Sequence, residues 1–146
     1  LIMWTGKKRR EVTIHQSIIC IKIHGESGEK HWAFTETGDV QTMEEKTKLK
    51  DIFKQAQSKD SLMWQTVISF DNKWLEKNGL YSSKDKVLDE ERLKGITRSA
   101  VHKMLEKEGL ENAVWSAAIH YNTDNIHVHV ATVEPEPMRE KKKYIQ

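Results

Sequence analysis

Three histidines lie close together in the sequence, on either side of a short polar segment. His120 ends the run WSAAIH, and His127 and His129 follow residues 121–125 in the run IHVHVATV. Alternate side chains of a β-strand share a face, so His127 and His129 point the same way and the aliphatic residues that alternate with them point into a core. A hairpin through residues 121–125 would bring His120 beside the other two. Three converging imidazoles can bind a metal ion and leave positions open for water or substrate.

Simpler explanations of this pattern carry less weight. A single histidine on a strand is often a partly buried polar residue, and an H-x-H pair also occurs by chance. Three histidines within ten residues, two of them in phase on one strand opposite an Ile/Val/Val face, favour a metal site over both explanations. A structural zinc site would usually have four closed ligands, and no cysteine lies near the motif.

The composition predicts one soluble domain. The chain has 146 residues, of which 32% are charged and 37% hydrophobic, and its mean hydropathy is −0.71. This length suffices for a core. No apolar run approaches the roughly 20 residues of a membrane span, and the apolar start of residues 1–11 is too short for a secretory signal. The single cysteine, Cys20, excludes an internal disulfide and fits a reducing cytoplasm, where we expect the protein.

The segments around the histidines predict an α+β architecture. Thr42 and Glu45 have the spacing of a capping box, and an apolar stripe follows at helical spacing: Leu49, Ile52, Phe53 and Ala56. Residues 63–70 are rich in β-branched and aromatic side chains and predict a strand. Asp71 begins a short helix that ends at Asn78-Gly79, and residues 81–86 form a polar loop.

A longer helix starts at Asp89 and ends at Gly109, with an apolar face made of Leu93, Ile96, Ala100, Met104 and Leu105. His102 belongs to this helix and is predicted to lie at its surface or boundary rather than to bind a ligand. Strands joined by a tight loop are antiparallel, so the fold is an antiparallel sheet with helices on one face and a three-histidine metal site on the other. Pro135 and Pro137 end the last strand.

The motif HYNTDNIHVHV, between WSAAI and ATVEPEP, resembles the three-histidine motif of mobilisation relaxases. These MobA/MobL-like enzymes of Gram-positive conjugative and mobilisable elements belong to the HUH (His-hydrophobic-His) endonucleases. MWQTVISFDNKWLEKNGLY and the long helix are also similar to this family. We therefore divide the chain into a segment without family match, residues 1–34, and a partial relaxase-like catalytic domain, residues 35–146, with an incomplete HUH fold.

The resemblance implies a metal-dependent relaxase that nicks and rejoins one DNA strand at a transfer origin. His120, His127 and His129 would then bind a divalent cation, Mg²⁺ or Mn²⁺, and a tyrosine would become joined to the 5′ phosphate. The implied partners are single-stranded DNA, accessory mobilisation proteins and a coupling protein. The net charge of +2 does not by itself indicate DNA binding, but Arg139, Lys141, Lys142 and Lys143 could contact phosphates. Trp64, Trp74 and Trp115 could stack on bases, although core packing explains each better.

The chain departs from the family at the nucleophile. Relaxases of this kind carry their catalytic tyrosine near the N-terminus, and residues 1–34 contain no tyrosine. Tyr81, Tyr121 and Tyr144 do not match the position of the nucleophile, so the catalytic residue is unassigned.

A frame shift would explain this difference. Methionine and tryptophan have single codons, so a frame one base upstream of Met3-Trp4-Thr5 encodes Val-Asp. With permitted codons chosen elsewhere, residues 1–11 then resemble the tyrosine-containing segment of the family. Our hypothesis is that about the first 34 residues are mis-framed, and the nucleotide sequence tests it. Two other functions stay open: a catalytically inactive remnant that binds DNA or metal, and a rolling-circle replication initiator, which shares the H-x-H site.

Overall fold

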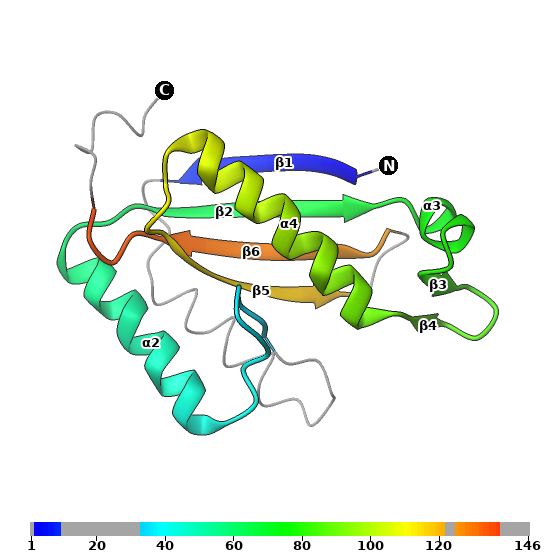
Figure 1. Ribbon diagram of the computed structural model, residues 1–146, viewed down its shortest axis with the longest axis horizontal. Coiled ribbons are helices and arrows are strands. Elements are labelled where there is room, and N and C mark those ends of the chain that lie inside the picture. The colour runs from blue at the N-terminus through cyan, green and yellow to red at the C-terminus, as the bar shows by residue number, and fades with distance from the viewer. Residues whose placement is uncertain (1, 10–32, 122–124, 138–146) are drawn as a thin grey trace.

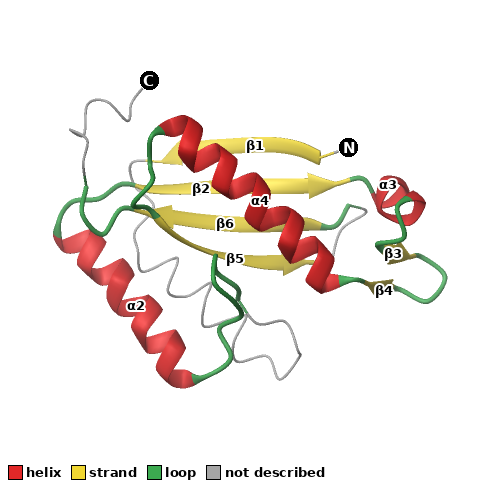
Figure 2. Cartoon of the chain, in the orientation of Figure 1, coloured by secondary structure: helices red, strands yellow, loops and turns green. Residues whose placement is uncertain are grey.

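The computed structural model describes residues 2–9, 33–121 and 125–137. Its main element is an antiparallel sheet of four strands in the order β1-β2-β6-β5 (Figure 1). The strands of this sheet are β1 (Ile2–Arg9), β2 (Met63–Phe70), β5 (Val114–His120) and β6 (His127–Val133). The helices are α2 (Met43–Ser58), α3 (Asn72–Lys77) and α4 (Glu90–Glu108) (Figure 2). Figure 1 shows α4 running diagonally across the sheet.

The α+β class and the antiparallel sheet predicted from the sequence are confirmed. Three strands were not expected: β1, and the short antiparallel pair β3 (Tyr81–Ser82) and β4 (Val87–Leu88). Residues 81–86 were predicted to be a polar loop, but Tyr81 and Ser82 form β3, which pairs with Leu88 and Val87 of β4.

The face of the sheet under α4 holds the larger core cluster. β6 contributes Val128 and Val130, which are 0% and 1% exposed, and β2 contributes Ile68 and Phe70. From α4, Leu93, Thr97, Val101 and Leu105 are buried, and the predicted residues Ile96, Ala100 and Met104 pack against the same cluster. Trp64 and Trp115 are buried in it and Trp74 packs against it, so the predicted core role of these tryptophans is confirmed.

The opposite face of the sheet carries the histidines at one end and α2 at the other. Leu49, Phe53 and Ala56 of α2 form one buried cluster with Met63 and Val133. Val133 lies four residues from His129 on β6, so these two side chains share a face. The helices therefore lie on both faces: α4 covers the face opposite the histidines, as expected, and α2 occupies the far end of the histidine face.

The helix boundaries follow local capping. Thr42 accepts a hydrogen bond from the N–H of Glu45 at 3.1 Å, Asp71 caps α3, and Asp89 accepts from the N–H of Arg92 at 3.2 Å. Gly109 ends α4 with a φ of 70°, a left-handed conformation that glycine adopts without steric cost. Among the described residues, no helix is long and apolar enough to cross a membrane.

Candidate metal centre

The end of the β5–β6 pair brings the three predicted histidines together. His120 and His127 are register partners, and His129 pairs with Ala118. The ring centroids of His120 and His129 are 4.2 Å apart, those of His127 and His129 are 4.8 Å apart, and those of His120 and His127 are 5.2 Å apart. One ligand atom from each ring lies within 4.8 Å of the other two. The convergence predicted from the strand alternation is thus present.

The spacing and chemistry of these rings suit one cation. Metal–nitrogen bonds of about 2.0–2.1 Å place the nitrogens of neighbouring ligands roughly 3 Å apart, so modest ring rotations would bring these atoms onto one ion. All three side chains are half-buried, and the valines that alternate with them are in the core. The backbone is therefore anchored on one face while the rings stay accessible on the other.

A hydrogen bond orients the ring of His127. Its Nδ1 lies 3.2 Å from the carbonyl oxygen of Asn125. A carbonyl oxygen only accepts, so Nδ1 carries the proton in the neutral ring, and Nε2 keeps the lone pair that a metal ion requires. A partner of this kind typically fixes the tautomer of a metal-binding histidine.

Tyr121 lies next to His120, but its hydroxyl group donates a hydrogen bond to Glu90 in the first turn of α4. Burial, the hydrogen bond to Glu90 and the negative charge of that carboxylate all raise the pKa of Tyr121 above its ordinary value. This environment opposes the phenolate form that a nucleophile needs. Tyr81 lies in β3 and packs against the core. Tyr144 lies outside the described residues.

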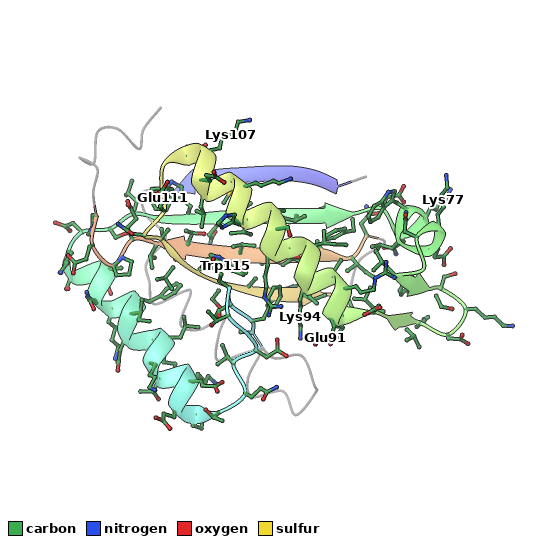
Figure 3. The ribbon with its side chains drawn as sticks, in the orientation of Figure 1. Lys77, Glu91, Lys94, Lys107, Glu111 and Trp115 are labelled. Atoms are coloured by element: carbon green, nitrogen blue, oxygen red, sulfur yellow. The ribbon has the colours of Figure 1, made fainter. Side chains whose placement is uncertain are left out.

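A segment outside the main sheet closes the free edge of β5. Phe34 and Ala117 exchange two backbone hydrogen bonds of 2.9 and 2.8 Å. Lys94 of α4 is 6% exposed and its Nζ lies 3.0 Å from Oδ2 of Asp39, while the guanidinium of Arg98 donates to the carbonyl of Thr35 at 2.9 Å. Figure 3 shows Lys94 and Glu91 on α4, on the side where this segment reaches the helix. The strand that ends at His120 is thus held on both edges.

The other residues singled out from the sequence fall into two groups. His102 is exposed on α4, near Glu36 and Glu106, which confirms its predicted surface position. The predicted DNA contacts Arg139, Lys141, Lys142 and Lys143 lie outside the described residues and stay predictions.

Sequence reasoning missed Asn72 and Glu90, which bond to Ile126 and Tyr121 at the two ends of the histidine connection. No local pattern signals either contact, because the partners are 54 and 31 residues apart.

A family model for MobL relaxases matches residues 24–145 of this chain. The chain belongs to the MobL relaxase family. The match includes all three histidines and begins at residue 24, eleven residues before residue 35, where the sequence predicted the domain to start. No curated protein and no solved structure matches the chain. Membership in the MobL family supports a DNA-nicking function of the relaxase type in general, and it confirms the resemblance seen in the three-histidine motif.

Proposed function

We propose that this MobL chain is the metal-binding part of a relaxase that nicks and rejoins single-stranded DNA at a transfer origin. The observation that carries the proposal is the convergence of His120, His127 and His129, with ligand atoms within 4.8 Å of one another, in a chain of this family. Accessory mobilisation proteins and a coupling protein are its expected partners. Origin DNA is cytoplasmic, and so is the proposed site of action.

The three nitrogen donors also affect which metal ion the site would prefer. Three imidazole nitrogens would hold the cation and leave its other positions for oxygen atoms of the scissile phosphate. When bound, the cation would supply positive charge to phosphate oxygens on which negative charge develops. Mg²⁺ prefers oxygen ligands and gives up water reluctantly, whereas imidazole suits transition metals better. Of the two expected ions, we therefore propose that Mn²⁺ binds more tightly than Mg²⁺.

The chain's own residues limit the choice of nucleophile. Tyr121 is adjacent to His120, but its bond to Glu90 and its raised pKa disfavour attack by its oxygen. Residues 1–34 hold no tyrosine. These two observations favour a second candidate function for this particular chain, a DNA- or metal-binding remnant without nicking activity. A rolling-circle replication initiator would share the metal chemistry but act on a replication origin.

One experiment separates these functions. The full chain is incubated with Mn²⁺ or Mg²⁺ and labelled single-stranded DNA, either from a transfer origin or from a replication origin. The products are resolved under denaturing conditions. A cleaved strand with a covalent protein adduct supports the relaxase, and mass spectrometry of the adduct identifies the tyrosine. Mn²⁺ binding without cleavage or adduct supports the remnant. Cleavage of replication-origin strands alone supports the initiator.

The matched controls are two histidine variants. His129→Ala removes a proposed ligand, and His102→Ala removes an exposed histidine of α4. Metal-dependent cleavage should disappear in the first variant and persist in the second. Equal loss in both variants, or equal activity in both, would contradict the assignment of the metal ligands.

A further inference from the structure

The connection between the two histidine strands is tied to α3 by one side chain. Asn72 is the first residue of α3, and its Oδ1 accepts a hydrogen bond of 3.0 Å from the backbone N–H of Ile126. The carbonyl oxygen of Ile126 accepts a second bond, of 2.8 Å, from the N–H of Phe70 at the end of β2. The side chain of Ile126 is 2% exposed in the core. Both backbone polar groups and the side chain of Ile126 are therefore fixed.

This residue directly precedes a proposed metal ligand. His127 is the first residue of β6 and forms the last pair of each ladder, with Ser69 and His120, a position where strands commonly fray. His129 lies inside both ladders, between Val67 and Ala118. The backbone of His127 thus depends more on what precedes it than the backbone of His129 does. The side chain of Asn72 supplies the acceptor that the N–H of Ile126 needs at this partly buried position.

The same contact also affects the ring of His127. The acceptor for its Nδ1 is the carbonyl oxygen of Asn125, which belongs to the peptide whose N–H bonds to Asn72. The planar peptide between Asn125 and Ile126 therefore accepts from His127 on one side and donates to Asn72 on the other. If the Asn72 bond is lost, this peptide can rotate, and the ring loses its fixed partner.

We infer that Asn72 is a positioning residue for the proposed metal centre: by holding the Asn125–Ile126 peptide, it sets the position and tautomer of His127. This role rests on the proposed histidine site. Asn72 would act on His127 through the backbone, because its side chain is bonded to the N–H of Ile126. Loss of partners that orient a metal ligand typically lowers metal affinity about 10–100-fold. The bond here is one step further from the ring, so the effect should lie near the lower end of that range.

The test uses three variants of the full chain. Asn72→Ala removes the acceptor, and Asn72→Asp keeps a side-chain oxygen at the same place. Asn78→Ala is the matched control, because Asn78 caps the other end of α3 and donates to the carbonyl of Trp74 without reaching the connection. Calorimetric titration with Mn²⁺ measures affinity, and nitrogen chemical shifts of the histidine rings in the metal-free protein report the tautomers.

Asn72→Ala should weaken Mn²⁺ binding about tenfold and shift the His127 ring signals, with those of His102 unchanged. Asn72→Asp should restore both readouts, and Asn78→Ala should leave both unchanged. Unchanged His127 signals in Asn72→Ala would overturn the inference. So would equal effects of Asn72→Ala and Asn78→Ala, which would indicate a general loss of stability. If the wild-type chain binds no Mn²⁺, the proposed metal function fails, and the ring signals of the metal-free protein still decide the role of Asn72.

Discussion

The three histidines differ in how firmly the sheet holds them. His129 lies inside β6, with Val67 on one side and Ala118 on the other. His120 ends β5 and His127 begins β6, so each depends on residues of the connection for its position. Val128, between His127 and His129, is fully buried and anchors the strand from the opposite face. His129 should therefore be the best single position at which to test metal ligation without disturbing the fold.

His129→Ala should abolish measurable Mn²⁺ binding while leaving the fold intact. Removal of a direct ligand should cost more than the roughly 10–100-fold that the loss of an outer partner costs. The side chain is half-buried, so the free energy of unfolding of the metal-free protein should change by only about 1 kcal/mol. Calorimetry measures the first effect and urea unfolding the second. Metal affinity within threefold of wild type would argue against ligation by this residue.

The environment of a single residue, Tyr121, can be tested by titrating its hydroxyl group. Its pKa is raised by burial and by Glu90, so the phenol stays neutral as exposed tyrosines ionise near about pH 10. Near-ultraviolet titrations of wild type and Tyr121→Phe should therefore show equal phenolate absorbance up to about pH 11. The stabilising contribution of the neutral phenol is complete below its unfolded pKa and is lost as pH rises through the raised folded pKa. A smaller phenolate signal in the variant near pH 10 would contradict this environment.

At the scale of elements, capping decides where each helix begins and therefore what it can position. Asp71 starts α3 so that the next residue, Asn72, faces the histidine connection, and Asp89 starts α4 so that Glu90 reaches Tyr121. The cap of α2 serves a different purpose. α2 packs with Met63 and Val133 at the end of the sheet remote from the histidines, so it contributes to stability more than to the site.

Thr42→Ala should lower the free energy of unfolding by about 1 kcal/mol because the N–H of Glu45 loses its acceptor. Metal affinity should stay at the wild-type value, since α2 packs with Met63 and Val133 at the other end of the sheet. Thr47→Ala is the control within the same helix: its hydroxyl bonds only to the carbonyl of Met43, and alanine favours the helix interior. Urea unfolding compares the variants. Destabilisation of Thr47→Ala equal to that of Thr42→Ala would show that the cap is not the cause.

At the scale of the whole molecule, the two faces of the sheet have separate tasks. The face under α4 holds the larger core, and the other face presents the histidines at one end and packs α2 at the other. Lys94 and Arg98 connect α4 to residues 35–39, which continue from the pairing of Phe34 with β5. These contacts anchor β5, the strand that ends at His120, so a metal ion bound at the histidines should stabilise the whole fold.

Mn²⁺ at about 100 times its dissociation constant should add roughly 2.7 kcal/mol to the free energy of unfolding. For a chain of this size, that corresponds to a rise of roughly 5–10 °C in Tm. A chelator should reverse the rise, and His129→Ala should show none, whereas His102→Ala should behave as wild type. Differential scanning calorimetry measures the midpoints. The same rise in His129→Ala would place the stabilising metal elsewhere on the protein.

The sequence alone determined the features that depend on neighbours a few residues apart. The alternation of His127, Val128 and His129 requires only that residues 127–133 form a strand, and Thr42, Asp89 and Gly109 delimit helices through bonds within a few residues of themselves. Such contacts follow from backbone geometry and side-chain chemistry. They sufficed to predict the class of fold and the three converging imidazoles.

Only the tertiary structure decided which distant residues meet. It placed β2 between β1 and β6, put α2 on the histidine face, and brought Asn72 to Ile126 and Glu90 to Tyr121. These pairs form because the sheet brings together segments that are far apart along the chain. Local conformational preferences do not specify such long-range contacts. The three converging histidines could be predicted because one hairpin carries them all, whereas the residues that bond to the ends of their connection come from other elements.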